Sequence, residues 1–416
     1  MADYQVPRGG VARLEHIDGE LKVGNKARIE ASKGKLVIVS KSAYFAGTSQ
    51  VNCNFECDSL HVQHGGTLRV NGDLIVHKLL DVNHSIDVSG LIKAEEIDVG
   101  GRIYSKVIEC DGRTRVGGFL DAKEKLEAQS VDVGGTAEAG EVKLQDLNVG
   151  GVARLRGGTI TGKIRVGGKF ESKASLEFGD LKVIGKILLP ANCKGEKVST
   201  FGRFSAAGNF ECKELENKGR MEIKGNCKSQ TIVSSGKLIL WGSLAVSREF
   251  DTWGTTEISG VLESSNLRIA GSFEAQRVLV NNEIELVGQA ETREGMKGDV
   301  VFVRSGSKYK GILVGGKVEI GKSYGVVSNW NTKWAGQNLA FRLVGKETRV
   351  EDIYAKEVHL GHASRCRKVF AEVVELEAGC VAEEINYTKE LRGEIDKCFI
   401  NRPFPKKVTL LPNPPL

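Results

Sequence analysis

Cysteine is the residue type in this chain whose spacing first suggests metal or redox chemistry. Cys53 and Cys57 form a Cys-x-x-x-Cys pair, and thiolates are preferred ligands of Zn²⁺. On one straight strand the two sulfurs would lie about 13 Å apart, too far to share an ion. The nine cysteines are scattered along the chain, and free cysteine packs as a small buried hydrophobe. The sequence therefore favours core packing over a metal or redox role.

The histidines do not complete a metal-ligand set either. Four of them lie in one third of the chain: His61, His64, His77 and His84. His359 and His362 flank a Leu-Gly pair further on. No third ligand accompanies either group at the short spacings that zinc sites use. We therefore predict solvated histidines at corners of the fold, and no metal site.

The remaining motifs do not form a catalytic set. The chain lacks the His-Glu-x-x-His pattern of zinc hydrolases, and its many Gly-Gly pairs do not open helices as phosphate loops do. Asp and Glu are plentiful, but they alternate with Lys and Arg, which is typical of a solvated face. We predict no catalytic residue and no cofactor-binding residue, and the sequence favours a protein that is not an enzyme.

Composition narrows the choice of partners and compartment. The 416 residues carry 59 Lys and Arg against 53 Asp and Glu, with both signs interspersed, and the 26 aromatic residues (4 Trp, 7 Tyr, 15 Phe) are not clustered with basic ones. We therefore do not expect nucleic acid as a partner. No stretch of 18 apolar residues is present to span a membrane. The first ten residues lack the apolar core of a signal peptide, and scattered cysteines suit a reducing compartment, so we expect a cytoplasmic protein.

Glycine marks the repeat that would position any site. Glycine accounts for 51 residues, whereas five of the 7 prolines fall in the last 14 residues. The tripeptide Val-Gly-Gly recurs with spacings of 17, 17, 16 and 17 residues, starting at Val99, Val116, Val133, Val149 and Val166. A fixed period of this size is the signature of a solenoid.

Within one period, apolar residues alternate with polar ones, which is typical of half-buried strands. After Gly118 the apolar set is Leu120, Ala122, Leu126, Ala128, Val131 and Val133. Three such pairs fit in about 17 residues, so a turn holds three short strands and three corners. We place the Gly-Gly pair at a corner, where glycine reaches positive φ without a Cβ clash. Helical spacing of the apolar residues is absent. The predicted fold is all-β, a parallel β-helix (solenoid) of roughly triangular cross-section.

Interruptions of the period divide the chain. A polar stretch follows Pro190, and Trp330 and Trp334 lie in a Ser/Asn-rich setting. The predicted parts are an N-terminal tail (1–10), a long β-helix (11–321) with a loop insertion near 190–205, a Trp-containing break (322–340), a second short β-helical segment (341–400) and a Pro-rich disordered tail (401–416).

The repeat resembles that of the bactofilins, a family of polymer-forming cytoskeletal proteins. The likeness is carried by Val-Gly-Gly at Val99, Val116, Val133 and Val166, by the runs at 70–74 and 358–364, and by the Pro-rich tail. The resemblance covers residues 36–190 and, less closely, 340–390. It implies a right-handed β-helix that assembles through its hydrophobic ends, without nucleotide, into non-polar filaments. The chain has several times the turns of a bactofilin domain. The family's N-terminal membrane-targeting segment is not evident in residues 1–10, so we do not expect membrane attachment.

The ends of a β-helix expose strand edges unless a cap covers them. No amphipathic helix is evident at either terminus, so we predict end-to-end stacking with copies of itself into a filament. The predicted N-terminal polymerisation interface is Val11, Leu14, Ile17, Leu21 and Val23. The predicted C-terminal polymerisation interface is Val373, Leu376, Val381 and Ile385.

Two other functions stay open beside the self-assembling cytoskeletal scaffold. A monomeric β-helical scaffold would bind other proteins through a flat face or the Pro-rich tail. A β-helical carbohydrate-active enzyme would need carboxylates that converge on one face. The regular repeat, the missing caps and the missing catalytic set favour the scaffold.

Overall fold

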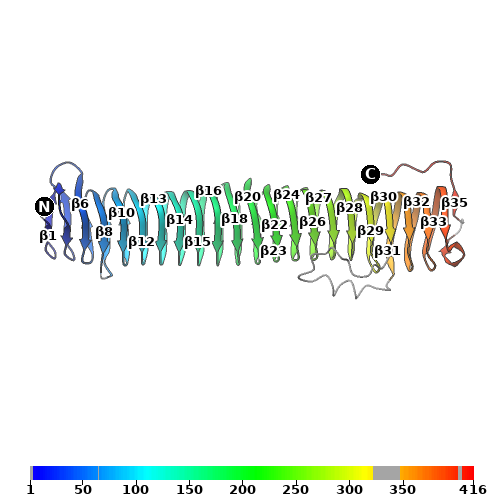
Figure 1. Ribbon diagram of the computed structural model, residues 1–416, viewed down its shortest axis with the longest axis horizontal. Coiled ribbons are helices and arrows are strands. Elements are labelled where there is room, and N and C mark those ends of the chain that lie inside the picture. Colours follow the sequence, from blue (N-terminus) through cyan, green and yellow to red (C-terminus); the bar gives the residue numbers. More distant parts are fainter. Residues whose placement is uncertain (1–2, 64, 322–346, 402–404) are drawn as a thin grey trace. The chain divides into compact units, whose positions relative to one another are not determined.

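The computed structural model describes residues 3–63, 65–321, 347–401 and 405–416, and these form a parallel β-solenoid (Figure 1). The solenoid has about 22 turns of about 17 residues, so the predicted all-β class and period are confirmed. Within these ranges the helical structure is one 3₁₀ turn, η1 (Ile395–Lys397). No helix of the described ranges has the length and apolar character needed to cross a bilayer.

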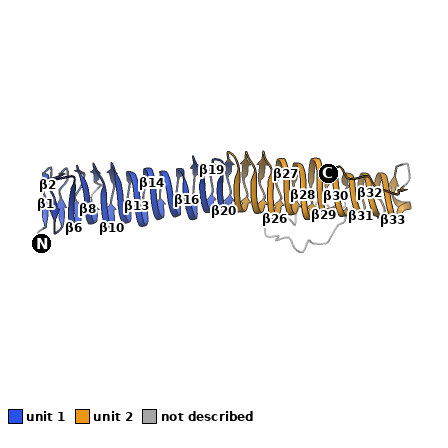
Figure 2. Ribbon diagram, turned by 90° about the horizontal axis from the view of Figure 1, so that it is seen from above, with its two compact units in different colours: residues 1–205 blue, residues 206–416 orange. Residues whose placement is uncertain are grey.

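The chain divides into two compact units, Met1–Ser205 and Ala206–Leu416, which Figure 2 colours separately. The strands of the first unit are β1 (Tyr4–Val6), β2 (Val11–Leu14), β3 (His16–Ile17), β4 (Leu21–Val23), β5 (Arg28–Ala31), β6 (Leu36–Phe45), β7 (Ser49–Val51), β8 (Asn54–Val62), β9 (Thr67–Val70), β10 (Leu74–Val82), β11 (Ser85–Val88), β12 (Leu91–Val99), β13 (Arg102–Val116), β14 (Phe119–Val133), β15 (Thr136–Val149), β16 (Val152–Val166), β17 (Lys169–Ser172), β18 (Leu176–Val183), β19 (Lys186–Leu189) and β20 (Cys193–Thr200). The boundary falls in β21 (Arg203–Ala206).

The second unit continues with the same kind of strand. Its strands are β22 (Phe210–Asn217), β23 (Arg220–Ile223), β24 (Cys227–Ser234), β25 (Lys237–Leu240), β26 (Leu244–Thr252), β27 (Thr255–Ile269), β28 (Ser272–Leu286), β29 (Gln289–Val303), β30 (Lys308–Ile320), β31 (Thr348–Leu360), β32 (Ser364–Leu376), β33 (Val381–Gly393), β34 (Phe399–Ile400) and β35 (Lys406–Lys407). The predicted break at 322–340 lies outside the described residues. The predicted second segment was 341–400; because β30 pairs in register with β31, its described residues 347–400 do not form a separate segment.

Each turn stacks on the next through three segments of parallel pairing. In β14 the first segment is Phe119–Ala122, the second is Lys125–Ala128 and the third is Ser130–Val133, and all three pair with β13 and β15. Register irregularities separate the segments where β14 pairs with β13. The three strands predicted per turn are therefore three paired segments, which β14 joins into one strand of 15 residues.

The core consists of ladders, in which residues of successive turns occupy the same inward position. One ladder runs through Leu120, Ala137, Ala153 and Phe170, and each of these side chains is fully buried. Burial alternates along β14 as the sequence pattern predicts. Removal of these apolar side chains from water is the main force that holds the turns together.

The Val-Gly-Gly corners require glycine for a different reason from the one predicted. None of the ten glycines in the five corners, all within the described range 65–321, has φ in the left-handed region. A Cβ on Gly117 would lie 2.0 Å from the carbonyl oxygen of Gly100 in the preceding turn. A Cβ on Gly134 would lie 2.3 Å from the carbonyl oxygen of Gly117. The corners stack so closely that only a hydrogen atom fits, and close approach selects glycine here.

The predicted loop insertion near 190–205 is wrong, because this stretch holds β20 and the start of β21. β20 pairs in parallel with β18, and Cys193, Val198 and Thr200 point inward and are buried. The sequence alternation is hard to see because polar and charged residues fill the positions between them. The period continues through this stretch without an insertion.

The two predicted tails also take part in pairing. In residues 1–10, β1 pairs with β4, and Val6 lies buried opposite Val23. In residues 401–416, β35 pairs with the last full turn. The chain then runs back along the second unit, so that the side chain of Leu416 lies beside Gly295 of β29. The prediction of disorder is therefore wrong for the described residues 405–416.

Candidate functional site

The N-terminal end of the first unit has a stepped edge. β2 forms the first segment of the first turn and pairs with β5, and β3 forms its second segment and pairs with β6. Among the described residues, no earlier strand covers β2 or β3. The third segment is β4, and β1 covers it. This end is therefore one strand longer on the third segment than on the other two.

Most of the predicted N-terminal interface belongs to the core. Val11 is 62% exposed, whereas Leu14, Ile17, Leu21 and Val23 are all buried. Leu14 and Ile17 retain exposures of 7% and 6%, against 0% for Leu21, which is covered by a strand on each side. This end therefore offers mainly the backbone groups of three strand edges, those of β1, β2 and β3.

The C-terminal end of the second unit has the opposite step. The first segment of β33 pairs with β34 at Val381 and Ala382, and its second segment pairs with β35 at Asn386 and Tyr387. Its third segment, Glu390–Gly393, pairs with β32, and no later strand covers it in the described part of the chain. This end is therefore one strand longer on the first and second segments, and within the described residues no later strand covers β34, β35 or the third segment of β33.

Of the predicted C-terminal interface residues, Val381 and Ile385 belong to the segments that β34 and β35 cover, whereas Val373 and Leu376 lie beneath the third segment of β33. Leu376 and Ile385 are buried, and Val373 and Val381 are half-buried. Their side chains belong to the core and to the pairing surface of the last two full turns. Within the described residues, the open backbone edges at this end are those of β34, β35 and the third segment of β33.

The two steps are complementary. The N-terminal end adds a strand on the third segment only, and the C-terminal end adds strands on the first and second segments only. If two copies met head to tail, β1 of one copy would face the third segment of β33 in the other. β2 and β3 would then face β34 and β35. Every open strand edge at the joint would then pair with a strand of the other copy, and none would be left for non-specific pairing.

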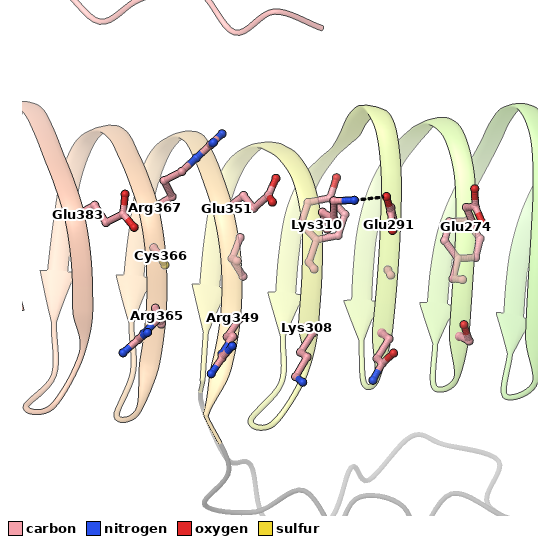
Figure 3. Close-up of a pocket in the computed structure, with 16 residues that line it drawn as sticks. Glu274, Glu291, Lys308, Lys310, Arg349, Glu351, Arg365, Cys366, Arg367 and Glu383 are labelled. Carbon is pink, nitrogen blue, oxygen red and sulfur yellow. Dashed lines mark hydrogen bonds and ion pairs between the residues drawn. The ribbon is translucent and has the colours of Figure 1, made fainter.

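The second unit also carries a shallow groove of about 510 Å³ along the first segments of β28–β32 (Figure 3). Lys308, Arg349 and Arg365 follow one another in register along one side. Glu347 accepts a hydrogen bond from Nε of Arg349 at 2.7 Å and forms an ion pair with Nε of Arg365 at 2.9 Å. The positive charge of this row is therefore partly neutralised within the protein.

Acids and bases are mixed along the other side of the groove. Figure 3 shows Glu274, Glu291, Lys310, Glu351, Arg367 and Glu383 one after another. Lys310 pairs with Glu291 at 2.6 Å, and Arg367 donates two hydrogen bonds to Asp352 at 2.7 and 2.8 Å. Glu274 and Glu291 are neighbours in register, and beyond them the carboxylates are interleaved with cations.

The cysteines are mainly core residues, as predicted. Eight of the nine, including Cys53 and Cys57, are buried. Burial raises the pKa of Cys53 to about 11 and that of Cys57 further, so both are neutral thiols at physiological pH. No group of three or more His, Cys, Asp or Glu residues within the described ranges could hold a metal ion.

The histidines are more constrained than predicted. His61 stacks on Tyr44 with ring centroids 5.2 Å apart and contacts Asp81. His359 is only 8% exposed, and its two ring nitrogens lie 2.9 Å from carboxylate oxygens of Glu375 and Glu377. The prediction of a solvated corner is wrong for His359. His64 lies outside the described residues.

Sequence reasoning missed one motif. Residues 321–325 spell Gly-x-Ser-x-Gly, the spacing of a hydrolase nucleophile elbow. Residues 322–325 lie outside the described ranges, so the structure gives no account of this motif.

Comparison with known proteins identified no relative of this chain. No family model, no curated protein and no solved structure matches the chain.

A buried carboxylate in the second unit predicts a pH dependence of stability. Desolvation, aided by Glu249 and opposed by Arg268, raises the pKa of Asp251 to about 6 from 3.8. The folded state therefore binds this proton more tightly than the unfolded state. The stability that Asp251 contributes is fully present below pH 3.8 and is lost as the pH rises through about 6. Asp251→Asn should stabilise the protein at pH 7 by about 1–3 kcal/mol.

The measurement is the urea midpoint between pH 4 and pH 7, followed by tryptophan fluorescence. Trp253 lies two residues from Asp251. The midpoint of the wild type should fall across this range by more than that of Asp251→Asn. Glu263→Gln, at an exposed carboxylate of the same unit, is the control and should follow the wild type. Equal pH profiles for the wild type and Asp251→Asn would contradict the assignment.

Proposed function

We propose that the protein is a structural, cytoskeleton-like scaffold that assembles head to tail with copies of itself, without nucleotide. The observation that carries the proposal is the complementary step of the two ends, β1 against the third segment of β33 and β34 and β35 against β2 and β3. In such a filament the parallel ladder continues from one copy into the next. An interface between two different surfaces, repeated without closure, gives an open filament.

The proposed filament shares its mode of stacking with the bactofilins but differs from them in polarity. As in that family, we propose a right-handed solenoid with a three-sided section and filaments formed by end stacking. A head-to-tail joint makes the filament polar, whereas the family forms non-polar filaments. The joint would be formed mainly by backbone hydrogen bonds, because four of the five predicted N-terminal interface side chains are already buried.

The test is a proline at the open edge of β2. Arg28 donates its N–H to the carbonyl of Gly10, and Ser32 donates to the carbonyl of Leu14. The even-numbered residues of β2 therefore bond to β5, and the N–H of Val11 points to the open edge. Val11→Pro removes that donor without removing a bond to β5. Val11→Thr keeps the N–H and the branched shape and is the matched control.

Negative-stain electron microscopy at low and moderate salt gives the readout. The wild type and Val11→Thr should form long filaments, and Val11→Pro should remain as isolated particles. Added to wild type at about one part in ten, Val11→Pro should shorten the filaments, because its C-terminal end still binds a wild-type N-terminal end and then stops growth.

Two results would overturn the head-to-tail joint. If Val11→Pro leaves the wild-type filaments unchanged in the mixture, the joint does not use the open edge of β2. If the wild type forms no filaments under any of these conditions, the scaffold function itself is wrong.

A further inference from the structure

Two cysteine sulfurs meet at the C-terminal end of the second unit. The Sγ atoms of Cys380 and Cys398 lie 3.0 Å apart. Val381 pairs in register with Phe399, so the two cysteines immediately before them occupy the same position in successive turns. Cys380 is fully buried. Of the nine cysteines, all within the described residues, Cys398 is the one that is not buried.

Backbone hydrogen bonds hold the pair on both sides. Phe399 donates its N–H to the carbonyl of Cys380 at 2.9 Å, and Gly379 donates to the carbonyl of Lys397 at 3.0 Å. The Cys398 thiol lies 3.2 Å from the carbonyl oxygens of Glu377 and Glu394. Adjacent strands are about 4.8 Å apart, which is within the Cα separation that a disulfide spans. A covalent bond would therefore require little movement of the backbone.

We propose that Cys380 and Cys398 are a redox-active pair that forms a disulfide on reaction with a small-molecule disulfide such as oxidised glutathione. This proposal does not depend on self-assembly. The bond would staple β34 onto β33 and hold the last strands on the end of the solenoid.

The reaction proceeds by two thiol–disulfide exchanges. The sulfur of Cys398 attacks one sulfur of oxidised glutathione, the S–S bond of that molecule breaks, and the leaving glutathione takes up the Cys398 proton. The sulfur of Cys380 then attacks the sulfur of Cys398 and displaces the second glutathione, which takes up the Cys380 proton. Two protein thiols are oxidised, and one small-molecule disulfide is reduced to two thiols.

Accessibility sets the order of the two steps. Cys398 is partly exposed and meets the reagent, whereas Cys380 is covered. Burial and the neighbouring Cys398 thiol raise the pKa of Cys380, so its thiol is a poor first nucleophile. Cys380 contacts Cys398 directly and therefore resolves the mixed disulfide.

The experiment treats the full-length protein with oxidised glutathione or with dithiothreitol, blocks the free thiols by alkylation, and analyses tryptic peptides by mass spectrometry. Cys380 lies in the peptide 369–389 and Cys398 in the peptide 398–406. The expected result is that these two peptides are joined after oxidation and separate after reduction. The oxidised protein should also show a higher Tm than the reduced protein.

Variants make the result specific. Cys380→Ser should leave Cys398 as a stable glutathione adduct, Cys398→Ser should abolish the link, and Cys193→Ser, at a buried cysteine elsewhere, should form the link as the wild type does. Cys398→Ser keeps the buried cysteine, so a folding defect is not expected to obscure the result. A wild-type protein with glutathione retained on Cys398, with both thiols unmodified, or with links to other cysteines would overturn the proposal.

Discussion

Gly117→Ala is expected to destabilise the first unit by about 3 kcal/mol or more, since over-packing against a rigid neighbour costs this much. The added Cβ would lie 2.0 Å from the carbonyl oxygen of Gly100. That oxygen belongs to the stacked backbone of the preceding turn and cannot rotate away as a side chain would. The two turns must separate, which stretches the parallel hydrogen bonds beside the corner. The effect should therefore far exceed the usual cost of alanine at a surface glycine.

Chemical denaturation followed by far-ultraviolet circular dichroism measures this loss. The four tryptophans all lie in residues 206–416, so tryptophan fluorescence reports the second unit in the same sample. Gly34→Ala is the matched control in the first unit. Gly34 has φ of +64° but no atom within 4 Å of an added Cβ, so only the backbone cost of about 1–2 kcal/mol applies. Equal losses in the two variants would show that close stacking does not select the corner glycines.

Phe170→Ala is expected to cost about 3–5 kcal/mol, the range for a large buried aromatic residue. Phe170 has no exposed surface and stacks in register between Ala153 and Ile187. Two alanines, Ala137 and Ala153, precede it in the ladder. The phenyl ring therefore fills space that these small side chains leave, and its removal opens a cavity that the fixed strand spacing prevents from closing.

A double-mutant cycle tests this account of the packing. Ala153→Leu alone should destabilise the unit by about 1–3 kcal/mol through over-packing. Combined with Phe170→Ala it should cost less than the sum of the two single losses, because the leucine occupies the new cavity. Phe119→Ala is the control, since Phe119 points outward and contacts Tyr104 on the surface. Its loss should be about 1 kcal/mol, and additive losses at Ala153 and Phe170 would contradict the shared cavity.

The period and the alternation were predictable where successive turns have nearly the same length. From Val99 to Val183 the apolar residues that the pattern placed inward, such as Leu120 and Val131, are buried. The inward ladder is a property of side chains, and side chains are what a sequence pattern describes. The same reasoning failed at 190–205, because Cys193, Val198 and Thr200 are small or polar inward residues separated by charged ones.

The candidate interface was predicted less well for a related reason. Apolar residues near the termini, such as Leu14 and Ile385, were taken as exposed end surfaces, but both are buried. What the ends expose is backbone, and a sequence does not state which strand edge stays unpaired. β34 and β35 pair with β33 because the chain continues over the first and second segments of the last full turn. Residue types alone do not predict this path. The contact of Cys380 with Cys398 follows from the same return.

Because successive turns stack in register, the length of each unit increases in steps of one strand spacing. Outward positions in one row recur at one strand spacing, about 4.8 Å, so a partner that contacts one such row meets a lattice of fixed pitch. Removal of one whole period, for example residues 118–134, would leave every later side chain on its original face and shift it by one lattice step. Removal of a single residue from within a paired segment would exchange inside and outside up to the next corner. Because turns of 16 and 17 residues stack in register, a corner can absorb one residue, and two sites in the same outward row of a unit are always separated by a whole number of turns.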